Sequence, residues 1–253
     1  MEARVTCVYD EGSLPDTALI GAKGFSLLVD VDGKRVLFDT GLRGRYLMHN
    51  LGRLKIPLDS LDCVVVSHNH RRNVGGLSVL LSEREEPIAV YAPPGLAETK
   101  TALIGQAIPG KQAAKAELVE TDGWARITDR LALSPSGESG ERFLLLSTAK
   151  GPVVLVACCH DGLPAVLAAA ESKAGKAPHA VIGGIHAQKT RREKTAAMAR
   201  EVMEKYGGIR LVLNGCTGYD GIHGMRDVFG LDGVGDFYVG MSIAFKTSPE
   251  TQL

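Results

Sequence analysis

Short apolar segments separated by turn-forming residues recur along the first part of the chain. Segments 25–31 and 35–38 flank Asp32-Gly33, a dipeptide that favours the tight turn of a β-hairpin. Segments 63–66 and 88–92 are continuous apolar runs, which is the pattern of strands covered on both faces. We therefore predict strands at all of these segments.

The second half of the chain alternates strand patterns with helical patterns. Its predicted strands cover 143–147, 153–158, 180–182 and 211–213. A helix is predicted over 164–173, and a longer one over 190–206 with Thr190 as its N-cap and Gly207-Gly208 at its end. This alternation predicts helices packed outside a sheet.

Composition and charge limit the classes of protein to consider. The chain has 253 residues, 45% of them hydrophobic, and can bury a core without disulfides or a structural metal. Its 29 basic and 29 acidic residues balance, so we expect no nucleic-acid or membrane partner. We expect a single domain over 1–253, in which the poorly periodic segment of about 96–140 is an insertion or a cap.

The cysteines and the apolar runs bear on the compartment. The five cysteines are an odd number with no disulfide spacing, which predicts a reduced, cytoplasmic protein. The N-terminal residues lack the apolar core of a signal peptide, and the apolar run at 153–159 is too short to span a bilayer. We expect Cys158, Cys159 and Cys216 to be small core residues, with Cys159 as an alternative metal ligand. Assembly into a homo-oligomer is left open.

A His-x-His loop carries the clearest chemistry. His68 and His70 follow the strand predicted at 63–66 and precede the turn at Gly75-Gly76. Two histidines at this spacing can converge on one cation, and neutral imidazole suits zinc or iron. A helix beginning near Val74 would point its N-terminus at the loop, which favours anions there.

Four other motifs occur in order around this loop. They are Leu37-Phe38-Asp39-Thr40-Gly41, Cys158-Cys159-His160-Asp161-Gly162, Gly183-Gly184-Ile185-His186 and Gly215-Cys216-Thr217-Gly218. Over about residues 20–245 the ordered set resembles the metallo-β-lactamase superfamily. It is most similar to the branch that includes relatives of the archaeal dihydropterin–ribofuranosylaminobenzene phosphate synthase. The resemblance implies an α/β fold, an αββα four-layer sandwich of two mixed β-sheets flanked by helices.

The resemblance also sorts the candidate ligands by metal position. Members of the superfamily typically hold two metals. The first position corresponds to His68, His70 and His160, all of which are present. The second corresponds to Arg72, Asn73 and Gly215, where the family has an aspartate and two histidines. The resemblance therefore implies one divalent metal with an open coordination position, zinc first, with iron and manganese as alternatives.

Further residues receive roles around that metal. Arg72 would replace the second metal and grip an anionic substrate, assisted by Asn73 and by Arg71. His186 would donate or accept a proton, and Thr217 would contact substrate. As alternatives, Arg71 is a solvated surface charge, and Arg72 fills an inactive site by hydrogen bonding to Asp39 or to a backbone carbonyl.

Two aspartates are expected to support the site. Asp39 would brace the metal loop through hydrogen bonds, and Asp161 would accept a histidine N–H. Neither is expected to react with substrate.

These features lead to one main hypothesis and two alternatives. The main hypothesis is a metal-dependent hydrolase that uses a metal-bound hydroxide on a phosphorylated or carboxylated small molecule. The first alternative is a catalytically inactive binding or scaffold protein, because three usual ligands are missing. The second is formation of a C–C or C–N bond on a pterin-like substrate, as in the synthase branch.

Overall fold

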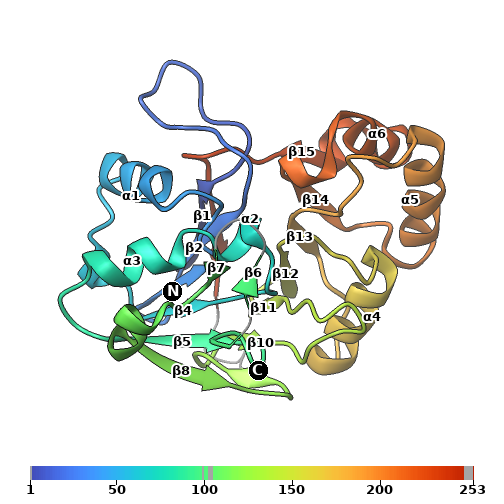
Figure 1. The fold of residues 1–253 in the computed structure, drawn as a ribbon. Helices are drawn as coiled ribbons and strands as arrows, with labels where there is room; N and C mark the ends of the chain where they lie inside the picture. The colour runs from blue at the N-terminus through green and yellow to red at the C-terminus, as the bar shows by residue number, and fades with distance from the viewer. Residues whose placement is uncertain (1, 99, 102–104, 248–252) are drawn as a thin grey trace. The chain divides into compact units, whose positions relative to one another are not determined.

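The computed structural model describes residues 2–98, 100–101, 105–247 and 253 (Figure 1). The chain divides into two compact units, which are described separately. The N-terminal unit comprises residues 3–124 and 238–244. The C-terminal unit comprises residues 125–237 together with residues at the two ends of the chain.

The N-terminal unit contains a seven-stranded mixed sheet in the order β16-β1-β2-β3-β4-β5-β8. The strands are β1 (Glu2–Tyr9), β2 (Ser26–Val31), β3 (Lys34–Phe38), β4 (Cys63–Val65), β5 (Ile88–Ala92), β8 (Ala116–Glu120) and β16 (Ser242–Lys246). Neighbours from β1 to β3 are antiparallel, and those from β3 to β8 are parallel. The strands predicted in this half are confirmed. Asp32 and Gly33 both have positive φ, as the predicted hairpin turn requires.

Helices cover this sheet through one apolar core. They are α1 (Gly44–Arg53), α2 (Arg71–Val74), α3 (Leu77–Glu83), and the 3-10 turns η1 (Leu58–Ser60) and η2 (Gly110–Lys115). Leu47 of α1 and Leu80 of α3 belong to one buried cluster with Leu37, Val64 and Val90 of the central strands. Burial of all three residues of β4 explains its continuous apolar sequence.

The helix expected from Val74 begins elsewhere. The short α2 starts at Arg71, directly after the His-x-His loop, and α3 begins only at Leu77. Gly75 and Gly76 separate the two helices at a close approach to the chain near Thr40. A Cβ atom at Gly76 would lie 2.2 Å from the Thr40 carbonyl oxygen, so this contact admits only glycine.

The C-terminal unit contains a second seven-stranded mixed sheet, in the order β15-β14-β13-β12-β11-β10-β9. The strands are β9 (Ala125–Arg126), β10 (Leu131–Leu133), β11 (Leu144–Ser147), β12 (Pro152–Val156), β13 (Ala180–Gly183), β14 (Arg210–Leu213) and β15 (Val234–Asp236). Neighbours from β9 to β12 are antiparallel, and those from β12 to β15 are parallel. The predicted strands of the second half are confirmed.

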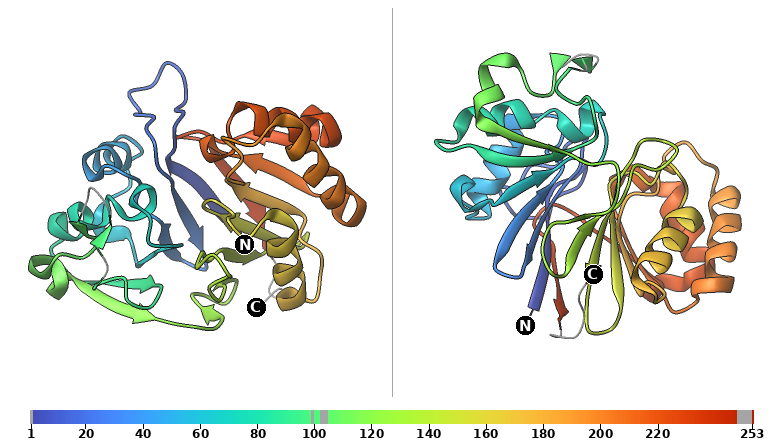
Figure 2. Two further views of the ribbon diagram at one scale, coloured as in Figure 1. Left: turned by 45° about the vertical axis from the view of Figure 1, so that its right-hand side comes forward. Right: turned by 90° about the horizontal axis from the view of Figure 1, so that it is seen from below.

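Three helices lie along this second sheet (Figure 2). They are α4 (Leu163–Ala174), α5 (Arg192–Tyr206) and α6 (Tyr219–Gly233), and the 3-10 turn η3 (Gly215–Thr217) precedes α6. α4 ends at Gly175, whose left-handed φ of 64° suits a C-cap glycine. The prediction of Thr190 as an N-cap is wrong. Arg191 is the N-cap, and the Thr190 N–H donates to the Ala187 carbonyl in a turn that precedes the helix.

The poorly periodic segment at 96–140 contributes to both sheets. It contains the edge strand β8 of the first sheet and strands β9 and β10 of the second. It also contains the two-stranded pair β6 (Lys100–Thr101) and β7 (Gly105–Gln106), while residues 99 and 102–104 lie outside the described residues. A role as a cap stays a prediction.

Within the described part of the chain, no helix is long and apolar enough to cross a membrane.

Candidate functional site

Three adjacent parallel strands of the C-terminal unit carry predicted site residues at their ends. The register of β12, β13 and β14 aligns Val156 with Gly183 and Gly183 with Leu213. The chain leaves the sheet at the same edge after each of these residues. Side chains two or three positions further on therefore meet, although they are far apart in sequence.

Cys158, His186 and Cys216 form a cluster at this edge. Each offers one ligand atom, a sulfur or a ring nitrogen, and these atoms all lie within 4.8 Å of one another. Cys216 Sγ lies 3.8 Å from His186 Nδ1. Cys158 is buried, Cys216 is half-buried and His186 is exposed, so the cluster opens to solvent on its histidine side.

The thiols of Cys216 and Cys159, both at this edge, differ in acidity. A hydrogen bond with Cys158, supported by His186, lowers the pKa of Cys216 from 9.0 to about 7, although burial opposes the shift. Burial and the nearby Glu141 carboxylate raise the pKa of Cys159 well above its usual value. Cys159 therefore remains a neutral thiol, whereas Cys216 supplies a thiolate more readily.

The carboxylate of Glu141 holds the loop after β12. It accepts backbone N–H groups from Cys158 at 2.7 Å, Cys159 at 3.0 Å and His160 at 2.7 Å. Cys159 has a left-handed φ of 60°, and such a turn directs successive N–H groups toward one anion. Sequence reasoning missed Glu141, because its role depends on a contact 17 to 19 positions along the chain.

The loops after β13 and β14 are held by side chains and by close backbone packing. His186 has a left-handed φ of 49°. Its neighbour Ile185 donates its N–H to Thr217 Oγ1 at 3.4 Å, and Thr217 is fully buried. Asn214 caps η3 by accepting the Cys216 N–H at 3.0 Å. The predicted contact of Thr217 with substrate stays a prediction.

His160 lies beside this cluster. Its ring centroid is 4.3 Å from that of His186, with the two rings tilted by 52°. His160 is exposed. The following residue, Asp161, accepts the Ser139 N–H at 2.7 Å and so ties the loop to the turn before β11.

In the N-terminal unit, Asp39 holds the His-x-His loop. It follows β3 with a left-handed φ of 61° and is fully buried. Its Oδ1 accepts the Ser67 N–H at 2.8 Å, and its Oδ2 accepts the Ser67 hydroxyl and the Asn73 Nδ2–H, both at 2.6 Å. The loop is thus fixed to the end of the neighbouring strand.

The same network orients His68. Ser67 donates its hydroxyl hydrogen to Asp39, so it accepts the hydrogen bond from His68 Nδ1 at 2.9 Å. This direction assigns a proton to Nδ1 and leaves Nε2 as the basic nitrogen, which is the usual arrangement of a metal-binding histidine. The ring of His70 is parallel to that of His68, with centroids 5.8 Å apart. These donors fit a divalent metal.

The residues that follow the two histidines occupy different environments. Arg72 is partly exposed, and its Nη1 lies 3.8 Å from Glu11 Oε1. Asn73 is fully buried, whereas Arg71 is half-buried. The structure thus groups His68, His70 and the three residues 71–73 in one unit, and His160 with His186 in the other. Joint ligation of one ion by His68, His70 and His160 stays a prediction.

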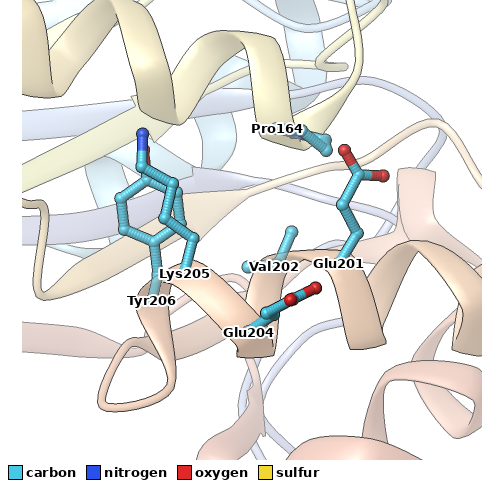
Figure 3. Close-up of a pocket in the computed structure, with 6 residues that line it drawn as sticks. All are labelled: Pro164, Glu201, Val202, Glu204, Lys205 and Tyr206. Atoms are coloured by element: carbon cyan, nitrogen blue, oxygen red, sulfur yellow. The ribbon is translucent and has the colours of Figure 1, made fainter.

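A surface hollow lies elsewhere, between α4 and α5 (Figure 3). It is lined by Pro164, Glu201, Val202, Glu204, Lys205 and Tyr206. Lys205 Nζ lies over the Tyr206 ring, 4.9 Å from its centroid, and pairs with Glu171 at 2.7 Å. None of the lining residues belongs to the predicted motifs, so we do not assign the function to this hollow.

Comparison with known proteins places the sequence near one branch of enzymes. No family model matches the chain. It is 23% identical over 239 residues to the 7,8-dihydropterin-6-methyl-4-(beta-D-ribofuranosyl)-aminobenzene-5'-phosphate synthase of Methanocaldococcus jannaschii. The match covers 78% of this chain and 81% of that enzyme.

Solved structures give the fold. Tm1679, a metal-dependent hydrolase of the β-lactamase superfamily, matches with a TM-score of 0.77 and 22% identity, covering 95% of this chain and 98% of that one. The metallo-β-lactamase fold protein YhfI from Bacillus subtilis matches with a TM-score of 0.66 and 13% identity, over 96% and 99% of the two chains. A diphosphatase of the PhnP family matches with a TM-score of 0.62 and 13% identity, over 99% of each chain. The chain therefore has the metallo-β-lactamase fold that its ordered motifs predict, and it is similar in sequence to a member of the branch that they resemble.

Proposed function

We propose that this protein is a metal-dependent hydrolase in which His68, His70 and His160 hold one divalent ion. The observation that carries the proposal is the hydrogen-bond chain from Asp39 through Ser67 to His68. It fixes the loop, and it presents the imidazole with Nε2 as the basic nitrogen. A loop that only connected two elements would not need a buried carboxylate for this purpose.

The metal would supply the nucleophile. When bound, a zinc ion held by three histidines can lower the pKa of a water molecule to about 7. Iron and manganese are the alternative ions. The exposed ring of His186 would donate or accept the proton that moves during hydrolysis.

Arg72 would bind the anionic group of the substrate. A guanidinium presents paired donors that match a phosphate or a carboxylate. The separation of 3.8 Å from Glu11 exceeds a hydrogen-bond length, so Arg72 retains donors for a substrate while Glu11 limits its conformations. Arg71, Asn73 and Thr217 are the further candidates for substrate contacts.

A phosphorylated small molecule is the favoured substrate. The similar synthase is named for a phosphate compound, and one structural neighbour is a diphosphatase. Synthase-like bond formation on a pterin is the second candidate, because that synthase aligns with most of this chain.

Metal analysis and a substrate panel test the proposal. The protein is loaded in turn with zinc, iron or manganese, and bound metal and hydrolysis of phosphate esters are measured. We expect His70→Ala to lose one equivalent of metal and the activity, while His223→Ala in α6 retains both. Equal metal content in wild type and His70→Ala would contradict the proposal. Hydrolysis that persists after a chelator has removed the metal would contradict it as well.

Metal content also separates the enzyme from an inactive binding protein. If phosphate esters bind to the protein but no ion occupies the histidines, the binding or scaffold alternative is favoured. If the ion binds and a pterin substrate is joined to a second compound, the synthase alternative is favoured.

A further inference from the structure

We propose that Cys158, His186 and Cys216 form a second metal site, which binds a soft or borderline cation such as zinc through two thiolates and one imidazole. The site goes beyond the proposed hydrolase, because it shares no metal ligand with the His68, His70 and His160 set. It uses His186 as a metal ligand, in place of the proton-transfer role that the proposed hydrolase gives this residue. Its three donors come from the ends of three successive parallel strands, and the donor atoms lie within 4.8 Å of one another.

The spacing of one sulfur–nitrogen pair is close to that of a tetrahedral site. Zinc–sulfur bonds of about 2.3 Å and zinc–nitrogen bonds of about 2.0–2.1 Å place a sulfur and a nitrogen roughly 3.6 Å apart at the tetrahedral angle. The separation between Cys216 Sγ and His186 Nδ1 is 3.8 Å. For this pair of donors, an adjustment of a few tenths of an ångström would reach the tetrahedral spacing, and the Cys158 sulfur lies within 4.8 Å of both.

The donor types select the class of cation. Thiolates favour zinc, copper(I) and related soft ions, whereas calcium and magnesium prefer oxygen ligands. Binding would release the protons of Cys158 and Cys216 to solvent as the two sulfur–metal bonds form. Three protein donors would leave a fourth tetrahedral position for water or for an external ligand.

The three loops are fixed by interactions outside the cluster. Glu141 holds the backbone at Cys158, and Asn214 holds the backbone at Cys216. A Cβ atom at Gly183 would lie 1.7 Å from the Val156 carbonyl oxygen, so the loop that carries His186 starts from a close contact that only glycine permits. Rigid loops lose little conformational freedom when they bind an ion, which favours binding.

Cobalt binding to the full-length, reduced protein tests the proposal. Cobalt(II) bound by thiolates gives near-ultraviolet charge-transfer absorption, which histidine ligation does not give. We expect this absorption in wild type and in His70→Ala. Removing even a residue that supports a ligand typically weakens binding by about 10–100-fold. We therefore expect Cys216→Ser, which removes a ligand, to weaken thiolate-type cobalt binding by more than about 100-fold.

Two further variants control for folding and for thiol number. His186→Asn keeps a residue that tolerates the left-handed backbone, so its loss of cobalt affinity would report the ligand and not the loop. Cys63→Ala removes a buried thiol from β4, where burial raises the pKa of the thiol to about 12, and should leave the spectrum unchanged. Melting temperatures identify any variant that fails to fold.

Three results would overturn this site. The first is wild-type protein without thiolate absorption in excess cobalt or cadmium. The second is absorption that survives both Cys158→Ser and Cys216→Ser. The third is a disulfide between Cys158 and Cys216 in the freshly isolated protein, detected as a mass lower by two hydrogens. The proposed hydrolase can fail independently, because its metal is read from His70→Ala.

Discussion

Asn73 donates a hydrogen bond of 2.6 Å from its side-chain amide to Oδ2 of Asp39, and both side chains are fully buried. Asn73 stands where the metallo-β-lactamase superfamily has its third loop histidine. In this chain the side chain at that position braces the loop through the same carboxylate that holds Ser67. Asn73 thus contributes to the folded structure whatever part it takes in binding substrate.

We expect Asn73→Ala to destabilise the protein. It removes one donor from a buried carboxylate, and leaving such a group less satisfied costs about 1–3 kcal/mol. Urea denaturation would measure the change in the free energy of unfolding. Glu83→Ala, at the exposed end of α3, should cost less than about 0.5 kcal/mol. Equal effects of the two variants would contradict a bracing role for Asn73.

Glu141→Gln should loosen the loop that carries Cys158 and His160. In the wild-type protein three backbone N–H groups share the two oxygens of the carboxylate, whereas the glutamine amide offers them only one oxygen. Hydrogen bonds to charged groups contribute about 1.5–3 kcal/mol each. We expect a loss of stability on the order of 3 kcal/mol and faster hydrogen exchange at residues 158–160.

A nearby glutamate provides the control for that variant. Glu138 lies in the same segment but is exposed, so Glu138→Gln should change neither property. Unchanged exchange at 158–160 in Glu141→Gln would show that the loop holds its conformation without the charge.

Gly76→Ala should be strongly destabilising. The added methyl group would lie 2.2 Å from the Thr40 carbonyl oxygen, so the contact between α3 and the chain after β3 must open. A matched variant is Gly52→Ala in α1, where the added Cβ would have no heavy atom of the described residues within 4 Å. Alanine is favoured over glycine in a helix by up to about 1 kcal/mol, so Gly52→Ala should raise the melting temperature and Gly76→Ala should lower it.

Much of the fold follows from local sequence pattern. β4 is a continuous apolar run because both of its faces are covered, and that pattern is visible in the sequence. β8 lies at the edge of its sheet and is only partly buried, so its sequence has little apolar periodicity. The sequence pattern therefore does not predict the secondary structure of the segment around it. The His-x-His loop and the strand-end motifs were found because their residues are contiguous.

The site was less predictable wherever it depends on register. The pairing of Val156, Gly183 and Leu213 brings the side chain of Cys216 beside those of Cys158 and His186. The expectation of Cys216 as a core residue came from the average behaviour of cysteine, which ignores that register. The bond from Glu141 to the loop after β12 likewise has no local sequence pattern.

Arg72→Ala should weaken binding of anionic ligands. A charged hydrogen bond contributes about 1.5–3 kcal/mol, so the dissociation constant for inorganic phosphate should rise by about tenfold or more. Calorimetric titration of the metal-loaded protein would measure it. Arg53→Ala, at the exposed end of α1, controls for net charge. Equal affinity in wild type and Arg72→Ala would indicate that Arg72 serves only its contact with Glu11.

Ser67→Ala tests how the histidine is prepared for metal. The hydroxyl connects Asp39 Oδ2 to His68 Nδ1 at 2.6 Å and 2.9 Å, so its removal leaves the imidazole free to rotate and to change tautomer. Loss of such a supporting partner typically weakens metal affinity by about 10–100-fold. Ser67→Thr retains the hydroxyl and should recover part of the zinc affinity. If Ser67 had only a structural role, the bulkier threonine in this buried position would reduce the zinc affinity at least as much as alanine does. Zinc affinity measured by competition with a chelator, beside Ser82→Ala in α3 as the control, separates the two outcomes.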